Sequence, residues 1–343
     1  MDRRDRPDEM RPGGRVNRRK QERRRKRIRY LLMAFAAAVF VFGFWQLAGY
    51  GLDLMSSRRT SQHLKEVYYE TETDVPPDET MEERRAQNAV PVMETPCVTP
   101  TPPPAVTLTP AGSSAVSPVP TPSPVPRLSA AGYPDNPKLQ ISSRFRTLRK
   151  ESKSIVGWLS MGRILDEAVM QRDNVFYLNH DAAGKENVNG ALFLEASISL
   201  KQRPYTYIIY GHNMKSGAMF GSLRNYENRS FYHNDPFITF DTIYENGRYV
   251  VFAVSTVSTE SGRRNSVDFY EVASMNIEGR RQAIEDLIST SVYRCPVDVQ
   301  PDDQLLILVT CVEKDADRRV VAARRVRDGE DEQELKQSIA RGT

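Results

Sequence analysis

The sequence predicts a mostly β domain, a barrel or a sandwich, preceded by one membrane-spanning helix and a proline-rich stalk. From residue 133 to about 330 the composition is that of an ordinary globular domain, and turn residues separate short runs that alternate or are β-branched. Only a few helical patterns interrupt these runs. The predicted strands follow an apolar run at Ile155–Leu159; they are Ala191–Leu194, Thr206–Tyr210, Phe237–Asp241, Tyr249–Val257, Gln304–Val312 and Arg319–Val326.

Charge is divided unevenly along the 343 residues. Residues 1–29 hold 14 Lys/Arg against 5 Asp/Glu, a net of +9, so the total of +4 leaves −5 for the rest. The near balance excludes a strongly basic nucleic-acid-binding protein, and three Cys exclude a small disulfide-stapled protein. With almost nothing apolar to bury, residues 1–29 are expected to form a disordered basic tail.

Residues 30–52 are the predicted membrane anchor. This stretch has no charged residue, and 23 residues of helix span about 34 Å, enough for a hydrocarbon core of about 30 Å. The basic cluster that ends at Arg29 predicts a cytoplasmic N-terminus. By itself this cluster is also typical of a nucleic-acid or nuclear-import patch, and a cleaved signal peptide is the alternative for the apolar run. The run is long for a signal peptide and no small-x-small site follows it, which favours an anchor in the cell membrane.

Residues 53–132 are expected to form a disordered stalk. Twelve of the 22 prolines lie between Pro91 and Pro126, a spacing that favours polyproline II. Fully extended at about 3.1 Å per residue, this part would reach about 110 Å. We therefore expect a spacer that lifts the domain of residues 133–330 off the membrane. Residues 61–85 have some helical pattern, and Cys97 within the stalk is expected to be incidental.

Three helices are predicted within the domain. Asn136 is a candidate N-cap for a helix that runs to Lys153, with Pro137 in its first turn. The other two are expected at residues 217–226 and 276–289, where apolar residues share one face. Residues 331–343 are expected to be a C-terminal tail.

Cys311 is the candidate nucleophile. It follows the apolar run Leu305–Thr310, which predicts a central strand, and it precedes a charged turn. A thiol at the end of a core strand is held rigidly and still opens onto solvent, as a nucleophile requires. A plain buried cysteine is the alternative.

His212 and an arginine are the candidate partners of this thiol. His212 follows a strand and Gly211, and its imidazole can exchange protons near neutral pH. Arg318 and Arg319 open the last strand, and if that strand pairs with the Cys311 strand, one of them would lie beside the thiol and could bind an oxyanion. A histidine that hydrogen-bonds within its own turn and a solvated strand-edge arginine are the alternatives.

Together these residues resemble the class B sortases. The resemblance runs from about Asn136 to Arg327, and its most specific parts are the sequences YGHNMKSGAMFG at residues 210–221 and LVTC at residues 308–311. Residues 155–159 and 174–181 add support, and the helix before the Cys strand is similar to the class B elaboration. The family often has Ser where Val309 stands, which is a departure.

The resemblance implies an eight-stranded β-barrel and a cysteine transpeptidase of the Gram-positive surface. Such an enzyme cleaves a Pro-x-Thr-x sorting signal after Thr through a thioacyl intermediate. It then joins the surface protein to an amine of a peptidoglycan precursor or a pilin. By motif, Cys311 is the nucleophile, His212 the acid/base and Arg318 the oxyanion donor, with Arg319 as a rival. Thr310 and Asn213 are the implied substrate or oxyanion contacts.

No cofactor, metal or nucleic-acid partner is predicted. The sequence has no zinc motif or phosphate loop, and His180 and His233 are interpreted as structural. Two other functions remain open. One is a different wall-facing cysteine hydrolase such as an L,D-transpeptidase, although its Ser-His-Gly-Cys motif is absent. The other is an inactive, stalked binding module.

Overall fold

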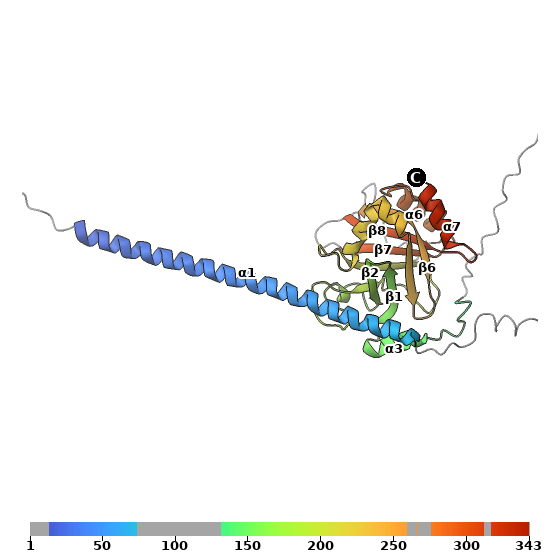
Figure 1. Ribbon diagram of the computed structural model, residues 1–343, viewed down its shortest axis with the longest axis horizontal. Helices are drawn as coiled ribbons and strands as arrows, with labels where there is room; N and C mark the ends of the chain where they lie inside the picture. Colours follow the sequence, from blue (N-terminus) through green and yellow to red (C-terminus); the bar gives the residue numbers. More distant parts are fainter. Residues whose placement is uncertain (1–13, 74–131, 259–265, 267–275, 312–316, 343) are drawn as a thin grey trace, which may run out of the picture.

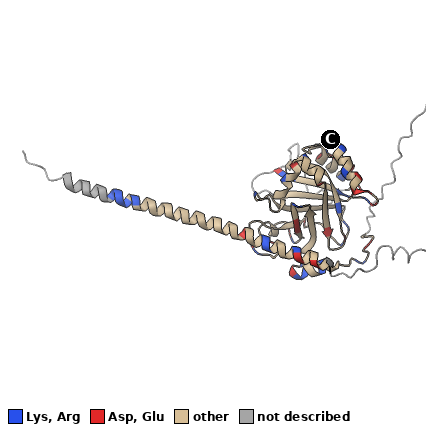
Figure 2. Ribbon diagram, viewed as in Figure 1, with Lys and Arg blue, Asp and Glu red and all other residues tan. Residues whose placement is uncertain are grey.

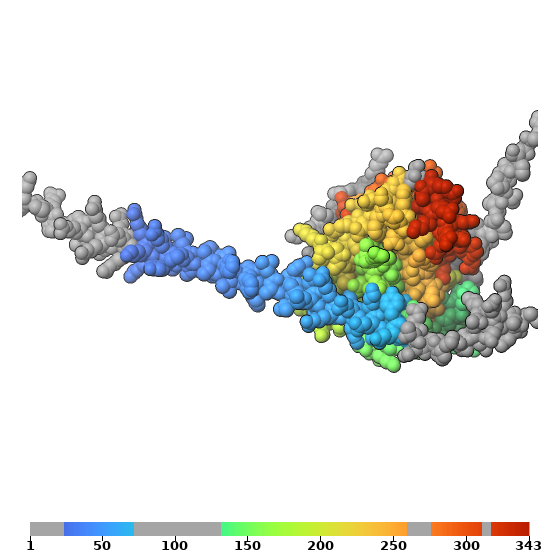
Figure 3. All heavy atoms as spheres, in the orientation of Figure 1, coloured from blue at the N-terminus to red at the C-terminus, as the bar shows by residue number. Residues whose placement is uncertain are grey.

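The computed structural model describes residues 14–73, 132–258, 266, 276–311 and 317–342, and it consists of a long helix and a β-barrel (Figure 1). Helix α1 (Gly14–Thr73) leaves the barrel for most of its length, and only its C-terminal part lies against the barrel (Figures 1 and 3). Its middle is long and apolar enough to cross a membrane and is not buried in the structure. Charged residues reappear along α1 where the helix reaches the barrel (Figure 2).

Eight strands form a closed barrel, in the order β1-β2-β3-β4-β7-β8-β6-β5. The predicted barrel is therefore confirmed. Most neighbours are antiparallel, whereas β2 pairs with β3 and β4 pairs with β7 in parallel. The strands are β1 (Ile155–Met161), β2 (Leu165–Met170), β3 (Leu192–Leu194), β4 (Thr206–His212), β5 (Phe237–Thr242), β6 (Arg248–Ser258), β7 (Leu305–Cys311) and β8 (Asp317–Arg325).

Strand β7 is a buried strand in the barrel. It lies between β4 and β8, and residues 305–310 are all buried. A strand that is covered on both faces is expected to be a continuous apolar run rather than an alternating one. This continuous run made β7 easy to predict. In contrast, β2 was not predicted, because Asp166 and Glu167 break its apolar pattern.

The helices in the domain agree with the prediction except at two starts. Helix α3 (Ser143–Glu151) begins seven residues after Asn136, and Ser142 caps it instead. Asn136 closes a preceding turn through hydrogen bonds with Gln140. The second predicted helix begins three residues later than expected, as the 3-10 helix η2 (Phe220–Glu227), and the third is α6 (Ile277–Ser289), which Asn276 caps. The remaining short elements are η1 (Phe176–Leu178) and α4 (Arg229–Asn234).

The prediction of a disordered chain is wrong for the residues on both sides of the apolar segment of α1. Helix α1 begins at Gly14, inside the basic tail, because Arg, Lys, Gln and Glu are good helix formers and extend a helix that the apolar segment nucleates. It ends at Thr73, inside the predicted stalk. Residues 74–131, which hold the proline-rich part, lie outside the described residues.

Side chains of α1 complete the core of the barrel. Leu64 and Tyr68 are buried, and the Tyr68 ring stacks on Trp158 with centroids 4.3 Å apart. The Tyr68 hydroxyl donates to Asp241 at 2.7 Å and accepts from Arg144 at 2.7 Å. Burial raises the pKa of Tyr68 well above its usual value. Because this docking precedes residue 74, the chain reaches the barrel before the proline-rich segment begins, which differs from the predicted order of anchor, stalk and domain.

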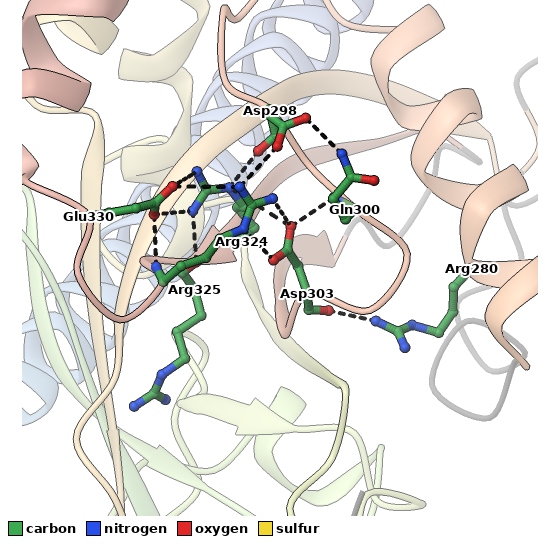
Figure 4. A network of polar contacts seen from close by, with 8 residues as sticks. Arg280, Asp298, Gln300, Asp303, Arg324, Arg325 and Glu330 are labelled. Carbon is green, nitrogen blue, oxygen red and sulfur yellow. Dashed lines mark hydrogen bonds and ion pairs between the residues drawn. The ribbon is translucent and has the colours of Figure 1, made fainter. Parts of the chain in front are cut away.

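The predicted C-terminal tail is also wrong, since residues 332–341 form helix α7 (Glu332–Arg341) with Ile339 buried. A network of charged side chains ties this end of the chain to the barrel (Figure 4). In it, buried Arg324 donates twice to Glu330 at 2.7 Å, and Arg327 donates to Asp303 at 2.7 and 2.8 Å. These bidentate pairs satisfy guanidinium groups that would be costly to bury alone.

Candidate active site

The backbone register places the two main candidates side by side. Strands β4 and β7 run parallel, and His212 at the end of β4 is level with Cys311 at the end of β7. In a sheet, residues at matching positions of neighbouring strands lie on the same face. His212 and Cys311 are therefore neighbours in the sheet at the same end of the barrel, although they are 99 residues apart in sequence.

Strand β8 brings the two arginines to the same end. Strands β7 and β8 are antiparallel, with Leu308 opposite Val321 and Val309 opposite Val320. Cys311 lies two residues beyond Val309 in β7, and Arg318 lies two residues before Val320 in β8, so both are at this end of the two strands. Arg319 is one position from Arg318 along β8, on the opposite face of the strand. Arg318 is half-buried.

Arg319 has a different environment. Its guanidinium donates to Glu227 of η2 at 2.7 Å. Its backbone N–H donates to the hydroxyl of Thr310 at 2.9 Å, and Thr310 is fully buried. The Thr310 hydroxyl therefore fixes the start of β8 against the end of β7. Both contacts hold Arg319 as part of the framework beside the candidate site.

His212 is oriented by residues outside the predicted site. Its Nε2 hydrogen-bonds to the backbone carbonyl of Leu178. Because a carbonyl oxygen only accepts, Nε2 carries the hydrogen, and Nδ1 of the neutral ring is left as the proton acceptor. Gly190 packs against the ring, and a Cβ built there would lie 3.2 Å from Cδ2 of His212. Gly190 also has φ +60, a conformation that favours glycine.

The loop after His212 is folded tightly onto itself. Exposed Asn213 forms a backbone bridge with Met219, which has a positive φ of 48°. Arg224 of η2 donates to the carbonyl of Met214 at 2.6 Å and to that of Gly221 at 2.7 Å. A Cβ at position 221 would meet the Met214 carbonyl oxygen at 2.0 Å, so glycine is required there. Arg224 thus clamps the segment that leaves the candidate base.

Cys295 is placed where a thiol is unreactive. It is half-buried near Tyr232, and burial raises the pKa of its thiol to about 11, against the smaller opposing effect of hydrogen bonds from Tyr232 and Ser291. A thiol that stays protonated at neutral pH is a poor nucleophile. Cys97 lies outside the described residues. Within the described part of the chain, no three His, Cys, Asp or Glu side chains are grouped as metal ligands.

The predicted site residues thus fall into two groups. His212, Cys311 and Arg318 are at the ends of three adjacent strands, while Thr310 is buried and Asn213 is exposed on the loop after β4. The Leu178 carbonyl, Gly190 and Arg224 were missed. Only Gly190 had a local signal, because Asn-Gly is a common turn dipeptide. A backbone carbonyl has no sequence signature.

Comparison with known proteins gives the same family. The family model described as Sortase domain matches residues 165–326. Sortase B of Listeria monocytogenes is 29% identical over 184 residues (52% of this chain, 72% of that protein), and sortase B of Staphylococcus aureus is 27% identical over 190 residues (54% and 75%).

Similar solved structures carry the same family name. One is a Staphylococcus aureus sortase B–substrate complex, which is 28% identical with a TM-score of 0.49 and covers 55% of this chain and 88% of its own. Another is sortase B from Bacillus anthracis in complex with AAEK2, at 27% identity and a TM-score of 0.49, covering 60% and 89%. Residues 165–326 of this chain therefore match the sortase domain of cysteine transpeptidases, and the relatives that the chain resembles are sortase B proteins.

Proposed function

We propose that this protein is a membrane-anchored class B sortase that cleaves a Pro-x-Thr-x sorting signal after Thr. It then transfers the cleaved surface protein to an amine of a peptidoglycan precursor or of another subunit. The single observation that best supports this proposal is the parallel register that makes His212 level with Cys311. A nucleophile and a proton-transfer group on neighbouring strand ends are the minimum that acyl transfer requires.

The proposed reaction has two halves. In the first, His212 takes the proton of the Cys311 thiol, the sulfur attacks the Thr carbonyl carbon, the peptide C–N bond breaks, and His212 gives that proton to the leaving amine. In the second, an acceptor amine attacks the thioester carbon, His212 takes its proton, and the sulfur leaves. The Leu178 carbonyl keeps the Nε2 hydrogen in place, so that Nδ1 is the nitrogen that exchanges the proton.

Arg318 is the proposed oxyanion donor. Its register position beside Cys311 suits a guanidinium that binds the negatively charged oxygen of each tetrahedral intermediate. Arg319 is less suited, because Glu227 and Thr310 already hold it on the opposite face. Thr310 is proposed to hold the strand ends together, and Asn213 to contact substrate from its exposed loop.

The apolar part of α1 is the proposed single-pass anchor, with the basic N-terminus in the cytoplasm and the barrel outside. The basic residues before the span and the uncharged stretch of residues 30–52 support this topology. The barrel would then face the compartment where surface proteins and wall amines meet.

Cleavage of a fluorogenic Pro-x-Thr-x peptide by the purified full chain tests the proposal. Cys311→Ala is expected to abolish cleavage, whereas Cys295→Ala and Cys97→Ala retain it. Full activity of Cys311→Ala would refute the proposal. Capture of a peptidoglycan stem peptide on Cys311, without cleavage of the sorting peptide, would favour an L,D-transpeptidase instead.

A further inference from the structure

We propose that the loop of residues 183–188 is a second membrane contact, which lies in the lipid headgroup layer beside α1. This inference rests on the proposed membrane anchor. It adds that the bilayer is a partner of the barrel itself and not only of the apolar helix.

Asn187 fastens this loop to the part of α1 that follows the apolar segment. Its side chain, 2% exposed, donates to the backbone carbonyl of Asp53 at 2.9 Å and to the Ser56 hydroxyl at 3.0 Å. Its carbonyl oxygen accepts from the Ser57 hydroxyl at 3.0 Å. The amide is therefore bonded to three residues within about one turn of α1, which fixes the position of the loop along the helix.

The position of residues 53–57 along α1 corresponds to the surface of the bilayer. Asp53 is the first charged residue after Arg29, so it marks the end of the 23-residue span. A bilayer has a hydrocarbon core of about 30 Å within a total of about 40–45 Å, so each headgroup layer is about 5–7.5 Å thick. From Asp53 to Ser57, α1 rises about 6 Å. A loop bonded to both of these residues thus lies within the headgroup layer.

The outer side of the loop suits that layer. Residues 183–186 are exposed, and Val188 is 51% exposed although it is β-branched and apolar. Met55 on α1 is 61% exposed. Lys185 and Glu186 are both exposed and offset each other in charge, so the position of the contact is set by the fixed attachment and by Val188 rather than by attraction to anionic lipid.

The contact would bring the candidate active site close to the bilayer. The same segment of chain supplies the Leu178 carbonyl before the loop and Gly190 after it, and both touch His212. A polypeptide or an amine that is itself held in the membrane therefore meets the site close to the headgroup layer, without crossing a long aqueous gap.

Site-directed spin labelling of the full chain in liposomes tests the inference. Single cysteines replace Val188 or Ile288 in a background of Cys97→Ser, Cys295→Ser and Cys311→Ala. Ile288 is 47% exposed and lies on α6, which is on the opposite side of the barrel from α1, so it is a matched aqueous control (Figure 1). A third label at Phe44, within the span, reports whether the helix is inserted.

The expected result is that oxygen reaches the label at 188 better than a water-soluble nickel complex does, whereas the reverse holds at 288. Equal, water-like accessibility at 188 and 288, with the label at 44 in hydrocarbon, would overturn the inference and leave the anchor intact. A water-like label at 44 would instead show that the proposed anchor is wrong and the headgroup contact with it.

Discussion

The candidate active site and the α1 interface are both built on the barrel, but from different contacts. Backbone register assembles the first, because it makes His212 level with Cys311 and places Arg318 at the neighbouring end of β8. Side chains assemble the second, and its hydrogen bonds join residues up to 173 positions apart, as between Tyr68 and Asp241. The site thus depends on the barrel as a whole, whereas the interface depends on a few buried polar groups that single substitutions can remove.

The largest expected effect is on the interface. Tyr68→Ala removes a buried ring that stacks on Trp158, and large-to-small substitutions of aromatic core residues cost about 3–5 kcal/mol. Denaturation of the full chain in detergent, followed by Trp fluorescence, measures this loss. Its neighbour Tyr69 is 41% exposed, and Tyr69→Ala should change stability much less. Equal effects would mean that α1 is not part of the folded core.

The next effect separates the two arginines. Arg318→Ala should lower kcat/KM for the sorting peptide by about 10²–10³, the usual loss when an oxyanion donor is removed. Arg319→Ala removes its bond to Glu227 and should lower kcat/KM much less. Thermal unfolding of both variants serves as the control for folding. The opposite ranking would assign the catalytic role to Arg319.

A smaller effect is expected for the clamp behind His212. Arg224→Ala frees the carbonyls of Met214 and Gly221 and should lower kcat about tenfold, with a broadened pH–rate profile because the imidazole is held less firmly. Arg224→Lys should restore only part of the rate, because an ammonium group does not reproduce the planar fork. An unchanged pH profile in Arg224→Ala would show that the clamp is only structural.

The smallest effect concerns pH. Burial at the α1 interface raises the pKa of Glu167 to about 7, and the hydrogen bond from Ser61 only partly opposes this. The folded state therefore favours the protonated acid. Its stabilisation is complete below the unfolded pKa, near 4.5, and is lost as the pH rises to about 7.

Measured between pH 5 and 8, the stability of the full chain should fall with rising pH by on the order of 1 kcal/mol more than that of Glu167→Gln. Ser61→Ala should keep the slope and shift it to higher pH, because it removes a hydrogen bond that favours the carboxylate. Identical slopes in the full chain and Glu167→Gln would exclude Glu167 as the titrating group.

The difference between backbone register and scattered side-chain contacts also decides how much could be predicted from the sequence. The barrel and the meeting of His212 with the Cys311 strand were within reach, because an apolar run that ends in Thr-Cys and a Gly-His turn are local patterns. Strand β2 was missed, because Asp166 and Glu167 contact polar side chains of α1. These two charged residues stand where the sequence of a buried strand would be apolar.

The docked part of α1 could not be predicted for a related reason. Composition changes sharply at Asp53, where the uncharged span ends, and a polar segment followed by prolines is typical of a linker. Its contacts, such as Ser57 with Asn187, involve small polar side chains far apart in sequence. Such pairs leave no periodic pattern, and neither does the Leu178 carbonyl that orients His212.

The most direct test of the central claim is the identity of the acylated residue. The full chain, mixed with a Pro-x-Thr-x peptide without an amine acceptor and quenched in acid, is digested and analysed by mass spectrometry. We predict that the peptide containing Cys311 carries the N-terminal fragment of the substrate, ending in Thr, as a thioester that hydroxylamine removes. Acylation of another residue, or cleavage that persists in Cys311→Ala without any adduct, would contradict the proposed mechanism.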